Sequence, residues 1–183
     1  MKEERLYIVG YMASGKSTFG RALAGKAGWR FVDLDEEIER QTGRSVAEII
    51  REDGEAAFRA LESSVLRQTS SLNKTVVACG GGTPCYRDNM EFMTLHGMTL
   101  WLVASPERMA ERIIQAGDTR PLVADKCPEE LAAFVTDHLR RRQPHYFKAQ
   151  WRFSGEHLET EAEIEKSVEA FLALGLFPNN KNI

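Results

Sequence analysis

Long hydrophobic runs are absent from this sequence: no stretch of its 183 residues approaches the roughly 20 consecutive apolar residues of a membrane-spanning helix. An excess of positive charge is absent as well, because the formal net charge is −3, whereas general nucleic-acid binders are usually basic. Residues 1–5 lead directly into a short apolar run, so we expect no secretion signal before it. We therefore expect a cytoplasmic protein whose partners include neither membranes nor nucleic acids.

Cysteine is scarce, with only Cys79, Cys85 and Cys127 in the chain. An odd number without a spacing pattern does not form a disulfide framework, and no C-x-x-C pair is present to bind zinc. We interpret all of them as free thiols, which is typical of a reducing compartment. The four histidines are scattered, so we interpret them as surface or structural residues rather than metal ligands.

The composition is that of an ordinary globular domain, with 43% hydrophobic and 28% charged residues. Short apolar runs rich in β-formers alternate with segments of helical periodicity. The predicted strands cover 6–9, 29–32, 75–79, 98–103 and 151–154. The predicted helices cover about 16–26, 35–51 with a break at Gly43, 55–70, 88–96, 106–115, 128–143 and 160–174. Alternation of this kind predicts a single α/β domain with a parallel sheet covered on both faces.

Residues 10–18 read Gly-Tyr-Met-Ala-Ser-Gly-Lys-Ser-Thr and match the phosphate-binding pattern G-x-x-x-x-G-K-[ST] between a predicted strand and a predicted helix. Gly10 and Gly15 let backbone N–H groups turn toward an anion, and the N-terminus of the following helix adds partial positive charge. Lys16 can reach the β- and γ-phosphates, and Ser17 can place its hydroxyl on Mg²⁺. The alternative, a glycine-containing turn with an unrelated lysine, is disfavoured by the flanking strand and helix. We therefore predict nucleotide binding here.

Two aspartates follow the second predicted strand, in Asp33-Leu34-Asp35. Since ligands in open α/β sheets collect at the carboxyl ends of the strands, this pair is expected beside the phosphate loop. One carboxylate could order Mg²⁺ through water, and the other could accept a proton from a substrate hydroxyl. A purely structural alternative is that Asp35 caps the helix that begins with Glu36. The neighbouring phosphate loop favours the catalytic interpretation.

Glycines and arginines form a second ligand-binding pattern. Gly80-Gly81-Gly82 follows a buried predicted strand and exceeds what a tight turn needs, which favours close approach of a substrate to the backbone. Arg59, Arg120 and the arginine run 140–142 offer guanidinium groups that clamp carboxylates or phosphates. For the run, the structural alternative is a solvated helix end, which we expect to hold for two of its three members.

These segments resemble, in order and in spacing, the motifs of the shikimate kinase family from Tyr7 to about Tyr146. The shared motifs are the phosphate loop 10–18, Phe31-Val32-Asp33-Leu34-Asp35 followed by Ile38-Glu39, Phe58-Arg59 with Glu62, the triple glycine, Arg120-Pro121-Leu122, and Arg142 with Tyr146. The sequence departs from the family pattern at Ala13, where glycine is usual, and at Ile50, where phenylalanine is frequent. Because alanine disfavours positive φ, we expect a slightly different loop backbone at Ala13.

The resemblance implies a three-layer α/β/α fold of the nucleoside monophosphate kinase-like P-loop type, with a five-stranded parallel sheet in the order 2-3-1-4-5. It implies one kinase domain over 1–183, made of a core, a shikimate-binding helical segment at about 33–62 and a lid at about 116–127. The implied reaction transfers the γ-phosphoryl group of ATP to the 3-hydroxyl of shikimate, on the route to chorismate and aromatic amino acids. The implied partners are ATP, Mg²⁺ and shikimate, and members of the family are commonly monomeric.

The resemblance also implies roles for individual residues. Asp35 is the expected base at the reacting hydroxyl, while Lys16 and Arg120 neutralise charge on the transferring phosphoryl group. Ser17 and Asp33 are the expected Mg²⁺ residues. Shikimate contacts are expected from Asp35, Arg59, Gly81, Gly82 and Arg142, with Glu62 orienting an arginine, and nucleotide contacts from Ala13, Ser14, Gly15, Lys16, Ser17, Thr18, Arg120 and, by a loose alignment, Arg112.

Two other functions compete with this one. A related small kinase could act on gluconate or on a nucleotide, but a nucleotide acceptor needs a base pocket, and the arginines with the triple glycine fit a small acid better. A GTPase-like switch normally carries N-K-x-D, whereas Asn73-Lys74-Thr75-Val76 lacks the aspartate and precedes a strand. The sequence therefore favours a kinase that acts on a small carboxylic acid.

Overall fold

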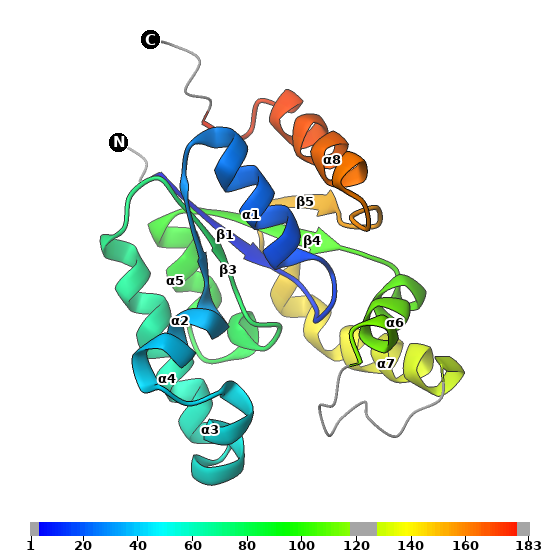
Figure 1. Cartoon of the computed structure of the whole chain (residues 1–183). Helices are drawn as coiled ribbons and strands as arrows, with labels where there is room; N and C mark the ends of the chain where they lie inside the picture. Colours follow the sequence, from blue (N-terminus) through cyan, green and yellow to red (C-terminus); the bar gives the residue numbers. More distant parts are fainter. Residues whose placement is uncertain (1–3, 118–127, 179–183) are drawn as a thin grey trace.

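A parallel β-sheet forms the centre of the computed structural model, which describes residues 4–117 and 128–178 (Figure 1). The strands are β1 (Arg5–Val9), β2 (Arg30–Asp33), β3 (Thr75–Ala78), β4 (Met98–Val103) and β5 (Trp151–Ser154). Their order in the sheet is β2-β3-β1-β4-β5, and each pair of neighbours is parallel. The predicted α/β fold with strand order 2-3-1-4-5 is therefore confirmed.

Helices cover both faces of the sheet, which makes the three layers of the predicted fold (Figure 1). On one face, α1 (Lys16–Ala27) and α8 (Glu161–Ala173) pack against Leu6 and Ile8 of β1. Tyr7 and Val9 of the same strand point to the other face and join a second core. That core is built with α2 (Leu34–Thr42), α3 (Val46–Asp53), α4 (Glu55–Gln68), α5 (Asn89–His96), α6 (Pro106–Gln115) and α7 (Pro128–Tyr146). Alternate residues of one buried strand thus serve two cores.

The break between α2 and α3 follows from local sequence signals. Gly43 ends α2 with φ 67°, a left-handed conformation that glycine adopts without a steric penalty. Ser45 then begins α3 through a capping box, in which its hydroxyl accepts from the Glu48 N–H and the Glu48 carboxylate accepts from the Ser45 N–H. The predicted division of 35–51 into two helices at this glycine is confirmed.

Several predicted strand and helix ends differ from the structure by one to three residues. β2 begins and ends one residue later than predicted, so Asp33 is its last residue. The predicted helix end at residue 143 is wrong, because α7 continues through Pro144 to Tyr146. Proline removes one backbone donor, but Tyr146 is fully buried and its hydroxyl donates to the carbonyl oxygen of Gly81 at 2.6 Å. Tertiary contacts of this tyrosine therefore outweigh the local signal to stop.

Among the described residues, none of the helices combines the length and the apolar character needed to cross a bilayer. Cys79 and Cys85 are free thiols, as predicted, and Cys127 lies outside the described residues. Burial raises the pKa of both described cysteines, which keeps them protonated at neutral pH.

Ile8, at the centre of β1, offers a test of the core beneath the phosphate loop. Its side chain is fully buried and lies beside Gly20 of α1. We expect Ile8→Ala to lower the free energy of unfolding by about 2–5 kcal/mol, because the substitution removes buried methyl groups and leaves a cavity. Urea unfolding measures the change. Leu95→Ala, at a position that is 80% exposed, is the control and should cost less than about 0.5 kcal/mol; equal losses would contradict the prediction.

Candidate active site

The three predicted ligand-binding loops meet at the carboxyl end of the sheet. A β-carbon added to Gly81 would lie 3.3 Å from the backbone nitrogen of Met12 in the phosphate loop. A β-carbon added to Gly80 would lie 3.3 Å from Oδ1 of Asp35, which is half-buried in the first turn of α2. The loop formed by Gly80, Gly81 and Gly82, the glycine loop, therefore lies against both the phosphate loop and the predicted base. Side chains at these glycines would fill the space between them.

The loop between β1 and α1 has the backbone of an anion-binding loop. Gly10 and Gly15 have φ values of 148° and 93°, which favour glycine. Ala13 also adopts a left-handed conformation, with φ 59°, although it carries a β-carbon. Lys16 is buried at the start of α1, and its Nζ donates to the carbonyl oxygen of Tyr11 at 2.7 Å. Its charge is thereby placed inside the loop.

One hydroxyl of this loop has an unmet hydrogen-bonding capacity. The Oγ of Ser14 is buried and has no hydrogen-bond partner within residues 4–117 and 128–178. It lies 3.0 Å from the position that a β-carbon on Gly10 would occupy. A buried donor without a partner, next to a lysine and a helix N-terminus, suits a phosphate group. The residues present therefore fit the predicted nucleotide.

Asp33 links the end of β2 to the start of α2. Its Oδ1 accepts from the N–H groups of Asp35 at 3.0 Å and Glu36 at 3.5 Å, so the N-cap of α2 is Asp33 and not Asp35. Its Oδ2 accepts a hydrogen bond from the hydroxyl of Ser17 at 2.5 Å. Two adjacent side-chain oxygens from different elements are the donors that Mg²⁺ prefers, so this pair fits the predicted ion.

Arg59 of α4 is held against the glycine loop by a buried carboxylate. Glu62 is fully buried and accepts from Nη1 of Arg59 at 2.9 Å and from Oγ1 of Thr83 at 2.5 Å. A β-carbon on Gly82 would lie 2.6 Å from Cζ of Arg59, so glycine is needed there to admit the guanidinium. Burial acts to lower the pKa of Arg59, but the charges and hydrogen bonds of Glu62 and, to a lesser extent, Glu55 outweigh it and raise the pKa above its ordinary value.

Arg142 of α7 is the second cation at the glycine loop. Its Nη1 lies 3.4 Å from the position of a β-carbon on Gly81, and its Cζ lies 5.5 Å from the ring centroid of Tyr11, in cation–π geometry. Arg140 and Arg141 are exposed. One of the three arginines therefore faces the site, as the sequence led us to expect.

Two tyrosines anchor α7 to the loops of the site. The Oη of Tyr11 lies 2.9 Å from Nδ1 of His138 on α7, and Tyr146 bonds to Gly81 as described above. Burial, followed by the charges of Arg142 and Arg141, lowers the pKa of His138, which favours the neutral ring. The contact between Tyr11 and His138 was not predicted, because no sequence pattern relates residues that lie 127 positions apart.

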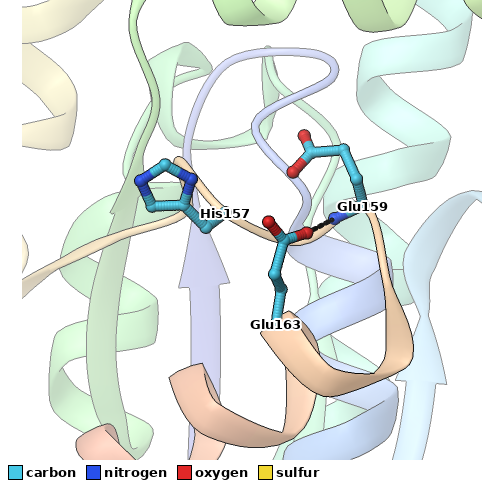
Figure 2. A group of neighbouring side chains, drawn as sticks. All are labelled: His157, Glu159 and Glu163. Atoms are coloured by element: carbon cyan, nitrogen blue, oxygen red, sulfur yellow. Dashed lines mark hydrogen bonds between the residues drawn. The ribbon is translucent and has the colours of Figure 1, made fainter.

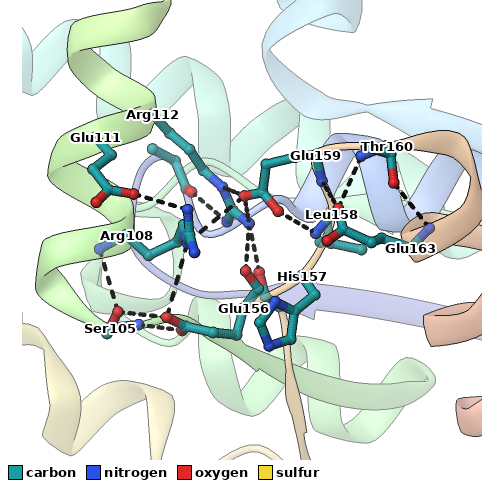
Figure 3. A network of polar contacts seen from close by, with 12 residues as sticks. Ser105, Arg108, Glu111, Arg112, Glu156, His157, Leu158, Glu159, Thr160 and Glu163 are labelled. Carbon is teal, nitrogen blue, oxygen red and sulfur yellow. Dashed lines mark hydrogen bonds and ion pairs between the residues drawn. The ribbon is translucent and has the colours of Figure 1, made fainter.

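Arg112 of α6 connects the phosphate loop to the loop that follows β5 (Figure 3). Its Nη1 donates to the carbonyl oxygen of Ala13 at 3.1 Å, and its Nη2 donates to those of Gly155 at 2.9 Å and Glu156 at 3.2 Å. Its Nε and Nη2 also donate to Oε1 of Glu159, at 3.0 and 2.7 Å. Since guanidinium donors lie in the plane of the group, its flat faces are compatible with adenine stacking, which stays a prediction. Arg120 and residues 118–127 of the predicted lid lie outside the described residues.

His157, Glu159 and Glu163 cluster at the start of α8, with potential ligand atoms within 4.8 Å of one another (Figure 2). Both carboxylates have other partners. Glu159 accepts from Arg112, and Glu163 accepts from the N–H groups of Glu159 at 3.1 Å and Thr160 at 3.0 Å. These contacts cap the helix and anchor the loop, so they account for the cluster.

An open groove of about 780 Å³ lies between α7 and the carboxyl ends of β4 and β5. Its lining includes Arg140, Arg152 and Glu156, but none of the residues predicted to act in the site. The carboxylate of Glu156 accepts from the N–H of Ser105 at 2.8 Å and from its hydroxyl at 2.6 Å. Ser105 is the N-cap of α6, so this carboxylate already has a structural role. The groove therefore adjoins the predicted nucleotide side through Glu156, whose carbonyl oxygen accepts from Arg112 at 3.2 Å.

A phosphate loop that faces an aspartate and two arginines defines a P-loop phosphotransferase with a small-molecule acceptor. A family model described as "Shikimate kinase" matches residues 12–173. The chain belongs to the shikimate kinase family, and it is an ATP-dependent kinase. The resemblance inferred from the motifs is thereby confirmed.

Individual relatives match along nearly the whole chain. A shikimate kinase of Parabacteroides distasonis is 39% identical over 171 residues, which cover 93% of this chain and 99% of the relative. The crystal structure of shikimate kinase from Bacteroides thetaiotaomicron matches with a TM-score of 0.88 and 39% identity, over 93% of this chain and 97% of that one. Shikimate kinase from Acinetobacter baumannii in complex with shikimate matches with a TM-score of 0.82 and 31% identity, over 95% and 93%.

The ion pair between Arg59 and Glu62 yields a stability prediction. We expect Glu62→Ala to lower the free energy of unfolding by about 3 kcal/mol, because it leaves a largely buried guanidinium without its main carboxylate. Glu55→Ala is the matched control: Glu55 pairs with the same arginine at 3.3 Å but its side chain is 70% exposed. This loss should stay below about 1 kcal/mol. Urea unfolding measures both, and similar losses would show that burial of the carboxylate is not decisive.

Proposed function

We propose that this protein transfers the γ-phosphoryl group of ATP to the 3-hydroxyl of shikimate, giving shikimate 3-phosphate and ADP, in the biosynthesis of chorismate and aromatic amino acids. The observation that supports the acceptor is the placement of Arg59 and Arg142, which lie against Gly82 and Gly81, in the loop beside the phosphate loop. Guanidinium groups bind carboxylates in a bidentate manner, and bare glycine backbone admits a small ring closely.

On the acceptor side, Arg59 and Arg142 hold the carboxylate of shikimate, and the backbone of Gly81 and Gly82 contacts the rest of the molecule. Glu62 acts through Arg59, whose guanidinium it orients. Asp35 binds the reacting hydroxyl and accepts its proton as the oxygen attacks the γ-phosphorus. Phosphoryl transfer needs positioning and charge neutralisation more than covalent help from the protein, and this set of residues can supply both.

On the donor side, the backbone of residues 13–18 binds the phosphates at the N-terminus of α1, and Lys16 neutralises charge on the transferring group. Arg120 adds a second cation, and Arg112 contacts the adenine. Ser17 and Asp33 would hold Mg²⁺, which when bound neutralises the phosphate oxygens.

The roles of the individual chain segments are part of the same proposal. Segment 33–62 binds the acceptor, segment 116–127 acts as a lid that keeps water from the γ-phosphate, and the rest of 1–183 is the core. We propose a cytoplasmic monomer that binds no nucleic acid.

The acceptor is tested by assaying phosphorylation of shikimate, gluconate and nucleoside monophosphates under identical conditions. Turnover with shikimate alone is the expected result. Turnover with another acceptor and none with shikimate would overturn the proposal. Parallel titrations with ATP and GTP test the donor, and a preference for GTP would favour a switch-like protein instead.

Asp35→Asn tests the proposed base. We expect turnover to fall by about 10²–10⁴-fold, because an amide cannot accept the proton of the acceptor hydroxyl. ATP binding, measured by calorimetry, should be retained, since Asp33 rather than Asp35 contacts Ser17 of the phosphate loop. Turnover within about threefold of the natural protein would remove Asp35 from the role of base.

Arg142→Ala tests the proposed carboxylate clamp. We expect the KM for shikimate to rise about 10–100-fold, because a charge-assisted pair is lost, while the KM for ATP changes little. Arg141→Ala is the matched control, since Arg141 is exposed on the same helix and pairs with Asp137 at 2.7 Å. Steady-state kinetics with each substrate varied provides the measurement. An unchanged KM for shikimate in Arg142→Ala would show the assignment to be wrong.

A further inference from the structure

The phosphate loop contains a strained turn at Ala13. The N–H of Ser14 donates to the carbonyl oxygen of Tyr11 at 3.3 Å, which closes a turn in which Ala13 is the third residue. Its φ of 59°, without a positive φ at Met12, matches the type II turn, whose third position favours glycine. Alanine resists this conformation because its β-carbon crowds the following carbonyl oxygen. Something outside the turn must therefore favour it.

Arg112 contacts the peptide group that follows this alanine. Its Nη1 donates to the carbonyl oxygen of Ala13 at 3.1 Å. Rotation of Ala13 to the right-handed region would turn that carbonyl away from the guanidinium, so the hydrogen bond favours the left-handed conformation. The donor is charged, and charge-assisted hydrogen bonds are stronger than neutral ones.

The guanidinium of Arg112 is itself fixed by Glu159 (Figure 3). Oε1 of Glu159 accepts from both Nε and Nη2, while Nη2 also reaches the carbonyl oxygen of Gly155 at 2.9 Å. The side chain of Arg112 is only 15% exposed. Burial acts to raise the pKa of Glu159, but hydrogen bonds from Arg112 and from the N–H of Leu158, together with the nearby arginine charges, lower it below its ordinary value. The carboxylate is therefore ionised at neutral pH.

The loop that carries Glu159 also packs on the phosphate loop directly. A β-carbon on Gly15 would lie 2.5 Å from Cδ1 of Leu158, and Gly155 lies close against the carbonyl oxygen of Ser14. The pair formed by Arg112 and Glu159 thus stands where α6, the loop after β5 and the phosphate loop meet.

We propose that Glu159 is a positioning residue for nucleotide binding: it fixes Arg112, and Arg112 holds Ala13 in the left-handed conformation that the phosphate loop requires. Glycine at this position would adopt the conformation without such support. The proposal rests on the proposed function only in taking ATP as the ligand of the loop. ATP binding is measurable without an acceptor, so the two can fail separately.

The experiment measures the dissociation constant of ATP by calorimetry for Glu159→Ala, in the natural chain and in the Ala13→Gly background. We expect affinity to fall about three- to tenfold in the natural chain, less than for the loss of a direct charge-assisted contact, because Glu159 acts on the loop only through Arg112. In the Ala13→Gly background the same substitution should cost less than about twofold, because the strain it exposes is no longer present. Glu159→Gln keeps an acceptor oxygen without the charge. In the natural chain it should therefore lower ATP affinity by less than Glu159→Ala does.

Glu111→Gln is the matched control, because Glu111 lies on α6 and its carboxylate pairs at 2.8 Å with Arg108 rather than with Arg112. It should leave ATP affinity within about twofold. Thermal unfolding of each variant checks the fold, since a merely structural contact would lower stability without any rescue by Ala13→Gly. Unchanged ATP affinity in Glu159→Ala, or an equal loss in both backgrounds, would overturn the proposal. A natural protein that binds ATP but does not phosphorylate shikimate would refute the proposed acceptor and leave this comparison valid.

Discussion

The parallel register of the three central strands determines where the groups of the candidate active site lie. Ile8 of β1 lies opposite Ala78 of β3, which in turn lies opposite Asp33 of β2. The ladder extends to the N–H of Cys79, which donates to the carbonyl oxygen of Ile8 at 3.0 Å. The phosphate loop, the glycine loop and the aspartates therefore leave the sheet at the same level. A slip by one residue would move a loop by about 3.3 Å and turn its strand to the opposite face.

Within this frame, the site is organised by charges that have protein partners. Arg59 is fixed by a fully buried carboxylate, Arg112 by Glu159 and three carbonyl oxygens, and Lys16 by the carbonyl of Tyr11. Donors that are already oriented need little rearrangement when charge develops in a transition state, which is how electrostatic preorganisation lowers a barrier. The carboxylates of Glu62 and Glu159 therefore contribute to the site by fixing the orientation of these arginines.

The phosphate loop, the aspartate pair and the triple glycine were predictable because each is a short pattern at the end of a predicted strand. The division of α2 from α3 was predictable from Gly43 for the same reason. The end of α7 was not, because Pro144 is a local stop signal that the burial of Tyr146 overrides. Capping of α2 by Asp35, the structural alternative to its predicted catalytic role, is not observed, because Asp33 at the end of β2 caps this helix instead.

By itself, the sequence determined the strand order through the family resemblance, the chemistry of the phosphate loop and the residue types available to bind an acid. These properties reside in local spacing, where a few neighbouring residues are sufficient. Only the tertiary structure decided that Arg112 meets Glu159, 47 positions away, and that Tyr11 meets His138, 127 positions away. It also decided that Ala13 keeps the left-handed conformation that its side chain resists. Such contacts depend on how whole elements pack, and no local pattern encodes the distance between two side chains from separate elements.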